Sequence, residues 1–138
     1  MLQGENQIYG KINDMIINTK KDFQIIGGEK DFLKFYHANF LEPLDKSELN
    51  LQILTNSSDR TLYVFDEIDR TNVKKIPSTT KGNICFVVKD NEEVLFFMKN
   101  SESGKENITA MWTNSEAMIY SKKLLFDLLW TKSKAIPL

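Results

Sequence analysis

The stretch from Asn83 to Met98 constrains the fold most, because it is the most apolar run in the chain. It predicts two short strands, Ile84 to Val88 and Val94 to Met98, joined by the polar turn 89–93. Both strands are almost continuously apolar, as a sheet covered on both faces requires. A sheet with one solvent-exposed face instead shows alternating apolar and polar residues. We therefore predict a hairpin at the centre of a sheet that has layers on both sides.

Length and charge narrow the class of protein. A chain of 138 residues with 41% hydrophobic content forms one domain around a single core. The formal net charge is −1, with 18 basic residues scattered among 19 acidic ones. This balance gives no electrostatic reason to expect nucleic acid as a direct partner.

The only cysteine, Cys85, excludes a disulfide framework and a cysteine metal cluster, and its apolar strand predicts a buried, reduced thiol. No apolar run approaches the roughly 18 to 20 residues that cross a bilayer. The opening MLQGEN lacks the layout of a signal peptide. We expect a cytoplasmic chain with no membrane contact, no metal and no cofactor.

Periodicity predicts the other elements. Helical spacing of apolar residues favours helices, and alternation favours strands. Helices are expected at 5–20, 29–41 and 113–132, and strands at 22–26, 49–54, 73–76 and 108–113. The region 59–69 fits either a short helix or a strand, and helix is favoured. The fold class is therefore mixed α/β, with a mixed sheet and helices on both faces.

Two details of these helices are specific expectations. The second helix should direct Leu33, Tyr36, Phe40 and Leu44 toward the sheet and end near Pro43. The last helix offers a capping-box spacing from Thr113 to Glu116.

Two sequence features of kinds that occur at functional sites have simpler interpretations here. The pair Gly27-Gly28 lacks the fuller glycine-rich fingerprint of a phosphate loop, so a strand-to-helix turn is favoured. His37 is the only histidine and has no partner at a defined spacing. It is interpreted as a packing or boundary residue.

Several segments together resemble a known family. They are DFQIIGG, LNLQILTNSSD, NICFVVKDNEEVLFF and AMWTNSEAMIYSKKLLFDLLW, of which the last, a W-T-N-S turn entering a helix that ends F-x-x-L-W, is the most specific. The pattern resembles the non-catalytic phospholipase D-like half-domain of TrmB-type sugar-sensing transcriptional regulators and of archaeal sensor histidine kinases. The resemblance covers nearly the whole chain and implies a phospholipase D-like fold.

Catalytic members of that superfamily carry a His-x-Lys pair followed, after four further residues, by Asp. One histidine attacks phosphorus, a second protonates the leaving group, and the lysines bind phosphate oxygens. The corresponding positions here are Asn83, Cys85 and Asp90, of which only the aspartate matches. Neither the nucleophile nor the phosphate clamp is present, so the resemblance implies no catalytic residues and a module that is inactive toward phosphodiesters.

The resemblance implies a sensory or regulatory input domain for signal transduction, spanning 1–138 of a longer signalling protein. The tail TKSKAIP resembles the junction to the linker of an archaeal sensor histidine kinase, which favours a two-component kinase parent. The alternatives are the effector-binding domain of a TrmB-type transcription regulator or a pure dimerisation module. Expected partners are a small-molecule effector, a second copy in a homodimer and an output domain in the same parent chain.

For a sensor, the expected ligand pocket is bounded by the loops 55–60 and 99–107 and by Trp112 to Ser115. Trp112, Asn114 and Asp90 are the predicted ligand-binding residues. Each has a structural alternative, because Trp112 suits a core, Asn114 a helix cap and Asp90 a turn.

Overall fold

The computed structural model describes residues 1–44, 48–77, 84–98 and 108–136. The strands form one mixed sheet in the order β1-β7-β6-β5-β2-β3-β4-β8. Their bounds are β1 Leu2–Gln3, β2 Asp22–Gly27, β3 Asn50–Thr55, β4 Val73–Lys75, β5 Phe86–Lys89, β6 Glu93–Met98, β7 Thr109–Thr113 and β8 Lys134–Ala135. The α-helices are α1 Glu5–Ile17, α2 Glu29–His37 and α3 Glu116–Lys132, and the 3-10 helices are η1 Glu42–Leu44, η2 Asp59–Phe65 and η3 Arg70–Asn72.

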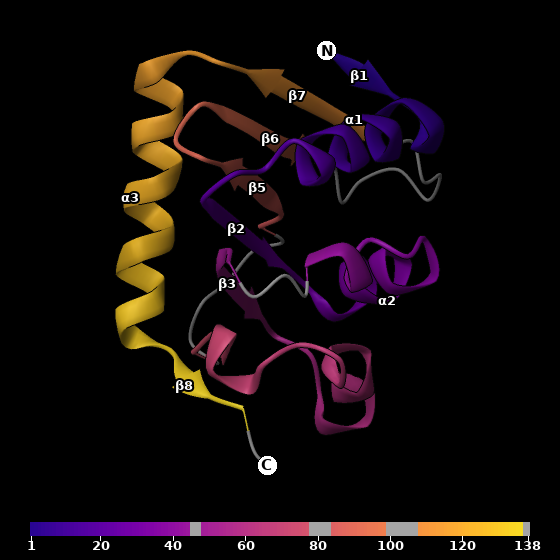
Figure 1. Cartoon of the computed structure of the whole chain (residues 1–138), viewed down its shortest axis with the longest axis vertical. Helices are drawn as coiled ribbons and strands as arrows, with labels where there is room; N and C mark the ends of the chain where they lie inside the picture. Colours follow the sequence, from indigo (N-terminus) through magenta and orange to yellow (C-terminus); the bar gives the residue numbers. More distant parts are fainter. Residues whose placement is uncertain (45–47, 78–83, 99–107, 137–138) are drawn as a thin grey trace.

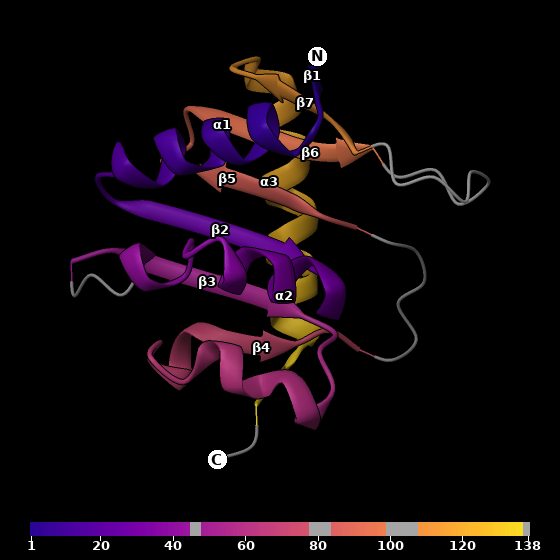
Figure 2. The same cartoon turned by 90° about the vertical axis from the view of Figure 1, so that its right-hand side faces the viewer.

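The sheet is covered on both faces, which confirms the expected layers. Helices α1 and α2 cover one face and α3 runs along the other (Figure 1). Strands β2, β3 and β4 are parallel to one another, and every other pair is antiparallel. The hairpin β5–β6 lies inside the sheet, between β2 and β7 (Figure 2). Its near-continuous apolar sequence is explained by burial on both faces.

Two apolar clusters hold the layers together. The larger one joins α1 and α2 to the sheet and contains Ile12, Phe23 and Phe35. The smaller one joins α3 to the opposite face through Phe86, Ile119 and Phe126. Helix α3 packs an apolar stripe on the sheet, with Met118, Leu125, Leu129 and Trp130 partly buried beside Ile119 and Phe126.

The expected inner face of the second helix is correct for Leu33, which packs partly buried against the larger cluster, and wrong for Tyr36. Helix α2 buries Phe32 and Phe35, whereas Tyr36 is 41% exposed. The helix also ends at His37, because Asn39 adopts a left-handed backbone with φ 61°. The N–H of Phe40 then donates to the carbonyl of Phe35, as in a Schellman motif. Phe40 and Leu44 are buried as predicted, but from the segment beyond the helix.

Two expectations at the last helix are also corrected. The capping box does not form, because α3 begins after Ser115, and the Thr113 hydroxyl accepts the N–H of Ser115 at 3.0 Å instead. The tail TKSKAIP, which resembles a junction to a linker, contributes Lys134 and Ala135 to the sheet, since β8 pairs antiparallel with β4. Short edge strands of two residues carry no periodic signal, so sequence patterns missed both β1 and β8.

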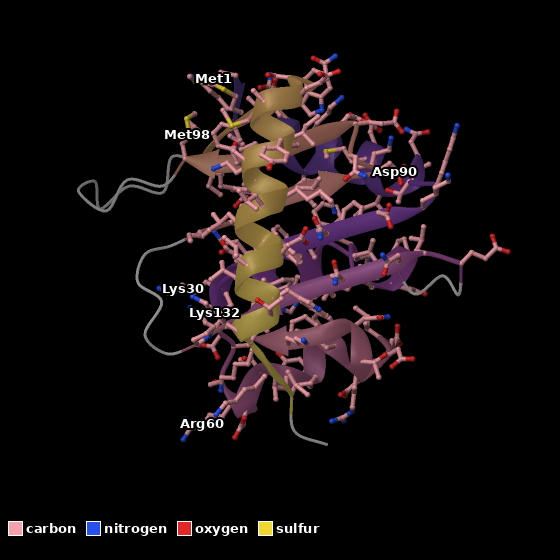
Figure 3. The ribbon with its side chains drawn as sticks, turned by 90° about the vertical axis from the view of Figure 1, so that its left-hand side faces the viewer. Met1, Lys30, Arg60, Asp90, Met98 and Lys132 are labelled. Carbon is pink, nitrogen blue, oxygen red and sulfur yellow. The ribbon has the colours of Figure 1, made fainter. Side chains whose placement is uncertain are left out.

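The strand directions define two edges of the sheet. We call the edge at Gly27, Thr55 and Lys75, where the parallel strands finish, the carboxyl edge. The opposite edge, at Asp22, Asn50 and the hairpin turn, is the amino edge. In Figure 3, Met98 marks the carboxyl edge and Asp90 the amino edge, on opposite sides of α3.

Candidate functional sites at the two edges and beside α2

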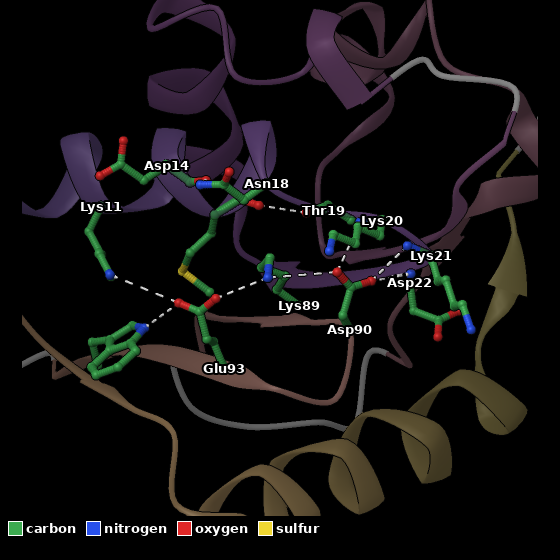
Figure 4. Close-up of polar contacts among 12 residues, drawn as sticks. Lys11, Asp14, Asn18, Thr19, Lys20, Lys21, Asp22, Lys89, Asp90 and Glu93 are labelled. Atoms are coloured by element: carbon green, nitrogen blue, oxygen red, sulfur yellow. Dashed lines mark hydrogen bonds and ion pairs between the residues drawn. The ribbon is translucent and has the colours of Figure 1, made fainter.

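Asp90 is the anchor of the hairpin turn at the amino edge. Asp90 and Asn91 have left-handed backbones, with φ 51° and 58°. The Asp90 carboxylate accepts three backbone N–H groups, from Lys20 at 2.9 Å, Lys21 at 2.8 Å and Asp22 at 2.8 Å (Figure 4). Both carboxylate oxygens are therefore used to join the turn to the connection between α1 and β2. This geometry fits the turn-residue interpretation of Asp90, and a ligand contact there stays a prediction.

A buried charge cluster continues from Asp90 along the hairpin. Lys89 is only 6% exposed, and its Nζ lies 3.0 Å from Glu93 Oε2 and 3.7 Å from Asp90 Oδ2. The other Glu93 oxygen accepts the indole N–H of Trp112 at 2.9 Å. Lys11 Nζ lies 3.9 Å from the same oxygen and 4.5 Å from the Trp112 ring centroid. The cluster links α1, the hairpin and β7 (Figure 4).

The environment shifts the pKa of each central group. Burial of Asp90 opposes its ionisation, but the three backbone donors outweigh burial, and the pKa falls below its usual range. Burial also opposes ionisation of Glu93, yet hydrogen bonds from Lys89 and Trp112 lower its pKa. Burial of Lys89 would lower its pKa, but Glu93 outweighs this and raises it. All three groups are therefore held in their charged forms.

These shifts predict the pH dependence of stability. The lowered pKa values of Asp90 and Glu93 mean that their contribution is complete above the unfolded values, at about pH 4 to 4.5, and is lost as pH falls through the folded values. The contribution of Lys89, whose pKa is raised, is complete below about pH 10.4 and is lost as pH rises through the folded value.

Urea unfolding at about pH 7, 4 and 3 would measure this effect. We expect the free energy of unfolding to fall in acid, and to fall less steeply in Glu93→Gln because one lowered carboxyl is gone. An identical slope in both proteins would contradict the assignment of the acid response to Glu93.

The predicted sensor pocket is split between the two edges. Thr113 pairs with Val94, so the segment from Trp112 to Ser115 lies at the amino edge. The loop after Thr55 lies at the carboxyl edge. A single pocket bounded by both is therefore wrong, because β7 runs antiparallel to β6 and delivers its end to the opposite side of the sheet. The expected third boundary, 99–107, lies outside the described residues.

The predicted side chains are consequently not gathered around one cavity. Trp112 is half-buried against the α1 side of the core, where its indole N–H donates a hydrogen bond to Glu93. Asn114 is exposed just before α3. Asp90 lies in the hairpin turn at the same edge. Direct ligand contacts by these residues stay predictions.

The resemblance aligns Asn83, Cys85 and Asp90 with the catalytic motif, and the two of these that the structure describes lie at opposite ends of β5. Cys85 is 3% exposed and belongs to the larger core cluster, at the carboxyl-edge end of β5. Asp90 follows the other end of the same strand. Asn83 lies outside the described residues. A buried thiol has no fixed positive charge, so Cys85 does not reproduce a phosphate-binding lysine.

The carboxyl edge holds a closed polar network at the start of α2. The Glu29 carboxylate accepts the N–H of Ser58 at 3.2 Å and the hydroxyls of Ser58 and Thr61 at 2.5 and 2.7 Å. The hydroxyl of Ser58 is the largest cause of the lowered pKa of Glu29. The N–H of Glu29 donates to Asn56 at 2.9 Å, and that of Gly28 to a side chain within α2. These contacts fit the predicted strand-to-helix turn at Gly27-Gly28.

A groove of about 420 Å³ lies between the end of α2 and η2. We call it the α2–η2 groove. Its floor is formed by three buried side chains, Leu41, Val64 and Ile68. The other lining residues are Tyr36, His37, Asn39, Glu42, Tyr63, Asp66 and Glu67. His37 thus lies at a helix boundary and also lines a groove. Sequence reasoning missed this site because Tyr36 was assigned to the buried face.

The described residues form neither a metal-binding cluster nor a membrane-spanning helix. No cluster of three or more His, Cys, Asp or Glu side chains in this part of the chain has the arrangement of a metal site. Among the same residues, no helix has the length and apolar character that crossing a bilayer demands.

Comparison with protein families identifies the chain. The family model of the EBD N-terminal subdomain of the transcriptional regulator TrmB matches residues 1–137. The chain belongs to this family. A search of curated proteins finds no match to this TrmB-family chain.

Solved structures share the fold of this TrmB-family chain. TrmBL2, an archaeal chromatin protein, is 12% identical with a TM-score of 0.68, and the match covers 98% of this chain and 53% of TrmBL2. The chain thus spans about half of TrmBL2, which binds DNA in a novel mode. NucT from Helicobacter pylori is 10% identical with a TM-score of 0.68, covering 95% of this chain and 92% of NucT.

A phospholipase D family member, Nuc from Salmonella typhimurium, is 10% identical with a TM-score of 0.61, covering 94% of this chain and 91% of Nuc. These likenesses confirm the phospholipase D-like fold that the sequence resemblance implied. At such low identity they concern the fold alone.

Proposed function

We propose that this chain is the non-catalytic, effector-binding input domain of a TrmB-type transcriptional regulator. The family match over residues 1–137 carries the proposal. The site geometry supports a non-catalytic domain. Cys85 is part of the core, and both carboxylate oxygens of Asp90 accept hydrogen bonds from backbone N–H groups. A cytoplasmic location and an output domain in the same parent chain belong to this proposal.

The regulator parent replaces the kinase parent that the tail TKSKAIP favoured. Residues 134 and 135 of that tail form β8 and pair with β4, so this part of the tail belongs to the sheet. The family match includes the tail up to residue 137 and concerns a transcriptional regulator. The family model and the solved structures described above give no support to a histidine kinase or a two-component system.

The proposal is tested by measuring how much promoter DNA the full-length natural protein binds with and without an effector. We call this quantity DNA retention. The protein is incubated with its promoter DNA and with sugars, nucleotides, organic acids or amines in turn. We expect at least one class to change retention by about fivefold or more, which corresponds to a coupling free energy of about 1 kcal/mol. The same protein should not hydrolyse a generic phosphodiester.

Two results would contradict the proposal. Phosphodiester turnover that is lost in Asp90→Ala would indicate an enzyme. DNA retention that no effector class changes, together with a mass that rises with concentration, would favour a pure dimerisation module. The observation that favours this second candidate is an exposed apolar line along α3, formed by Tyr120, Leu124 and Leu128, which are 69%, 47% and 54% exposed.

A further inference from the structure

The α2–η2 groove presents aromatic rings above an apolar floor. Tyr36 and Tyr63, which are 41% and 47% exposed, line this cavity of about 420 Å³. Their ring centroids are 5.6 Å apart with an interplanar angle of 89°. The His37 ring lies 5.6 Å from Tyr36 at an angle of 67°. Steeply inclined rings form a corner, and the π-face of a tyrosine attracts a cation.

Acidic side chains predominate among the residues that line the groove. Three lining residues are exposed carboxylic acids, namely Glu42, Asp66 and Glu67. The residues described as lining the groove include no lysine and no arginine. A concave surface lined by charges of one sign concentrates the opposite sign and repels its own. The groove therefore disfavours sugar phosphates, nucleotides and organic acids.

We propose that the α2–η2 groove binds a small organic cation, with the cationic head against Tyr36 and Tyr63 and the apolar body over the floor. The volume of about 420 Å³ falls in the usual range of small-molecule sites. The carboxylates of Glu42, Asp66 and Glu67 supply the electrostatic attraction. Binding of the cation stands on the groove alone, whereas its role as an effector rests on the proposed function.

The groove also reaches toward the carboxyl end of the described chain. Tyr63 and Asp66 line a second cavity of about 400 Å³, which Ile136 also lines. Ile136 follows β8 and is 7% exposed. An occupant that fixes Tyr63 restrains one wall of this second cavity. The cation site is therefore placed to influence the segment that follows α3.

A matched pair of probes tests the proposal. Choline carries a quaternary ammonium, and 3,3-dimethyl-1-butanol is its neutral isostere. Each is titrated into the ¹⁵N-labelled chain, and amide chemical shifts are followed. We expect choline to shift the amides of Tyr36, Tyr63 and Glu67, and the isostere to bind about tenfold more weakly because it lacks the charge.

Variants distinguish an effect of the Tyr63 ring on choline binding from an effect on folding. Tyr63→Ala should weaken choline binding about tenfold, whereas Tyr63→Phe should keep it, since the ring remains. Glu67→Gln should weaken binding and reduce its salt dependence. Tyr120→Ala, an exposed tyrosine on α3, is the matched control and should change nothing. Unchanged spectra away from the groove would show that each variant is folded.

Several results would overturn the proposal. They are equal binding of choline and the isostere, shifts confined to another surface, unchanged binding in Tyr63→Ala, or no shift at tens of millimolar choline. The two proposals fail separately. If a different class of effector alters DNA retention and choline does not bind, only the cation site is wrong. If choline binds as expected and no effector alters DNA retention, the regulatory function is wrong.

Discussion

Replacing Asp90 by alanine is expected to lower the free energy of unfolding by about 3 kcal/mol. The change removes the acceptor of three backbone N–H groups, from Lys20, Lys21 and Asp22. It also places alanine at φ 51°, where a residue with Cβ is strained and the short polar side chains of Asp and Asn are tolerated best. Urea unfolding followed by circular dichroism would measure the loss.

Asp90→Asn is the matched control for this prediction. Asparagine tolerates the left-handed backbone and keeps one side-chain oxygen, so we expect a loss of only about 1 kcal/mol. A loss below about 1 kcal/mol for Asp90→Ala would contradict the prediction. It would show that water accepts the three N–H groups in place of the carboxylate without loss of stability. Equal losses for both variants would assign the effect to charge rather than to the acceptor geometry.

Replacing Glu93 by leucine, in a separate variant, is expected to lower the free energy of unfolding by about 3 kcal/mol. The Glu93 carboxylate lies 3.0 Å from the buried Lys89 ammonium and also accepts the Trp112 indole N–H. Without it, the Lys89 charge keeps only Asp90, at 3.7 Å, as an ion-pair partner among the described residues. Leaving one partner of a buried pair uncompensated costs more than removing both partners.

The double variant Lys89→Met with Glu93→Leu tests that reason. It removes both charges from the buried site and replaces them with apolar groups of similar length. We expect it to be about 2 kcal/mol more stable than Glu93→Leu alone, measured by urea unfolding under the same conditions. A double variant that is less stable than the single one would show that the pair itself, rather than the unpaired lysine, determines the loss.

Local patterns predicted much of the fold. The apolar run at 84–98 predicted an internal hairpin, and β5 and β6 form one between β2 and β7. Helical periodicity predicted a helix at 5–20, and α1 buries Ile8, Ile12, Met15 and Ile16 there. Such patterns succeed because burial of one helix face or one strand repeats at the period of the element.

The candidate sites were much less accessible to sequence reasoning. The predicted pocket joined loops that lie at opposite edges, because strand direction follows from the pairing of β7 with β6 and not from the residues within β7. The groove was missed because Phe32 and Phe35 form the buried face of α2, which leaves Tyr36 exposed. The second wall, η2, follows the 3-10 pattern, which has no strong periodic signature.

The sequence by itself therefore determined the family and the phospholipase D-like fold, whereas the loss of the catalytic motif at Asn83 and Cys85 stays a prediction from the resemblance. Only the tertiary structure decided what the remaining polar residues do. Asp90 meets backbone donors that lie about 70 residues earlier in the chain, and Tyr36 meets Tyr63 across two elements. Contacts of this kind depend on the packing of separate segments, which no local period records.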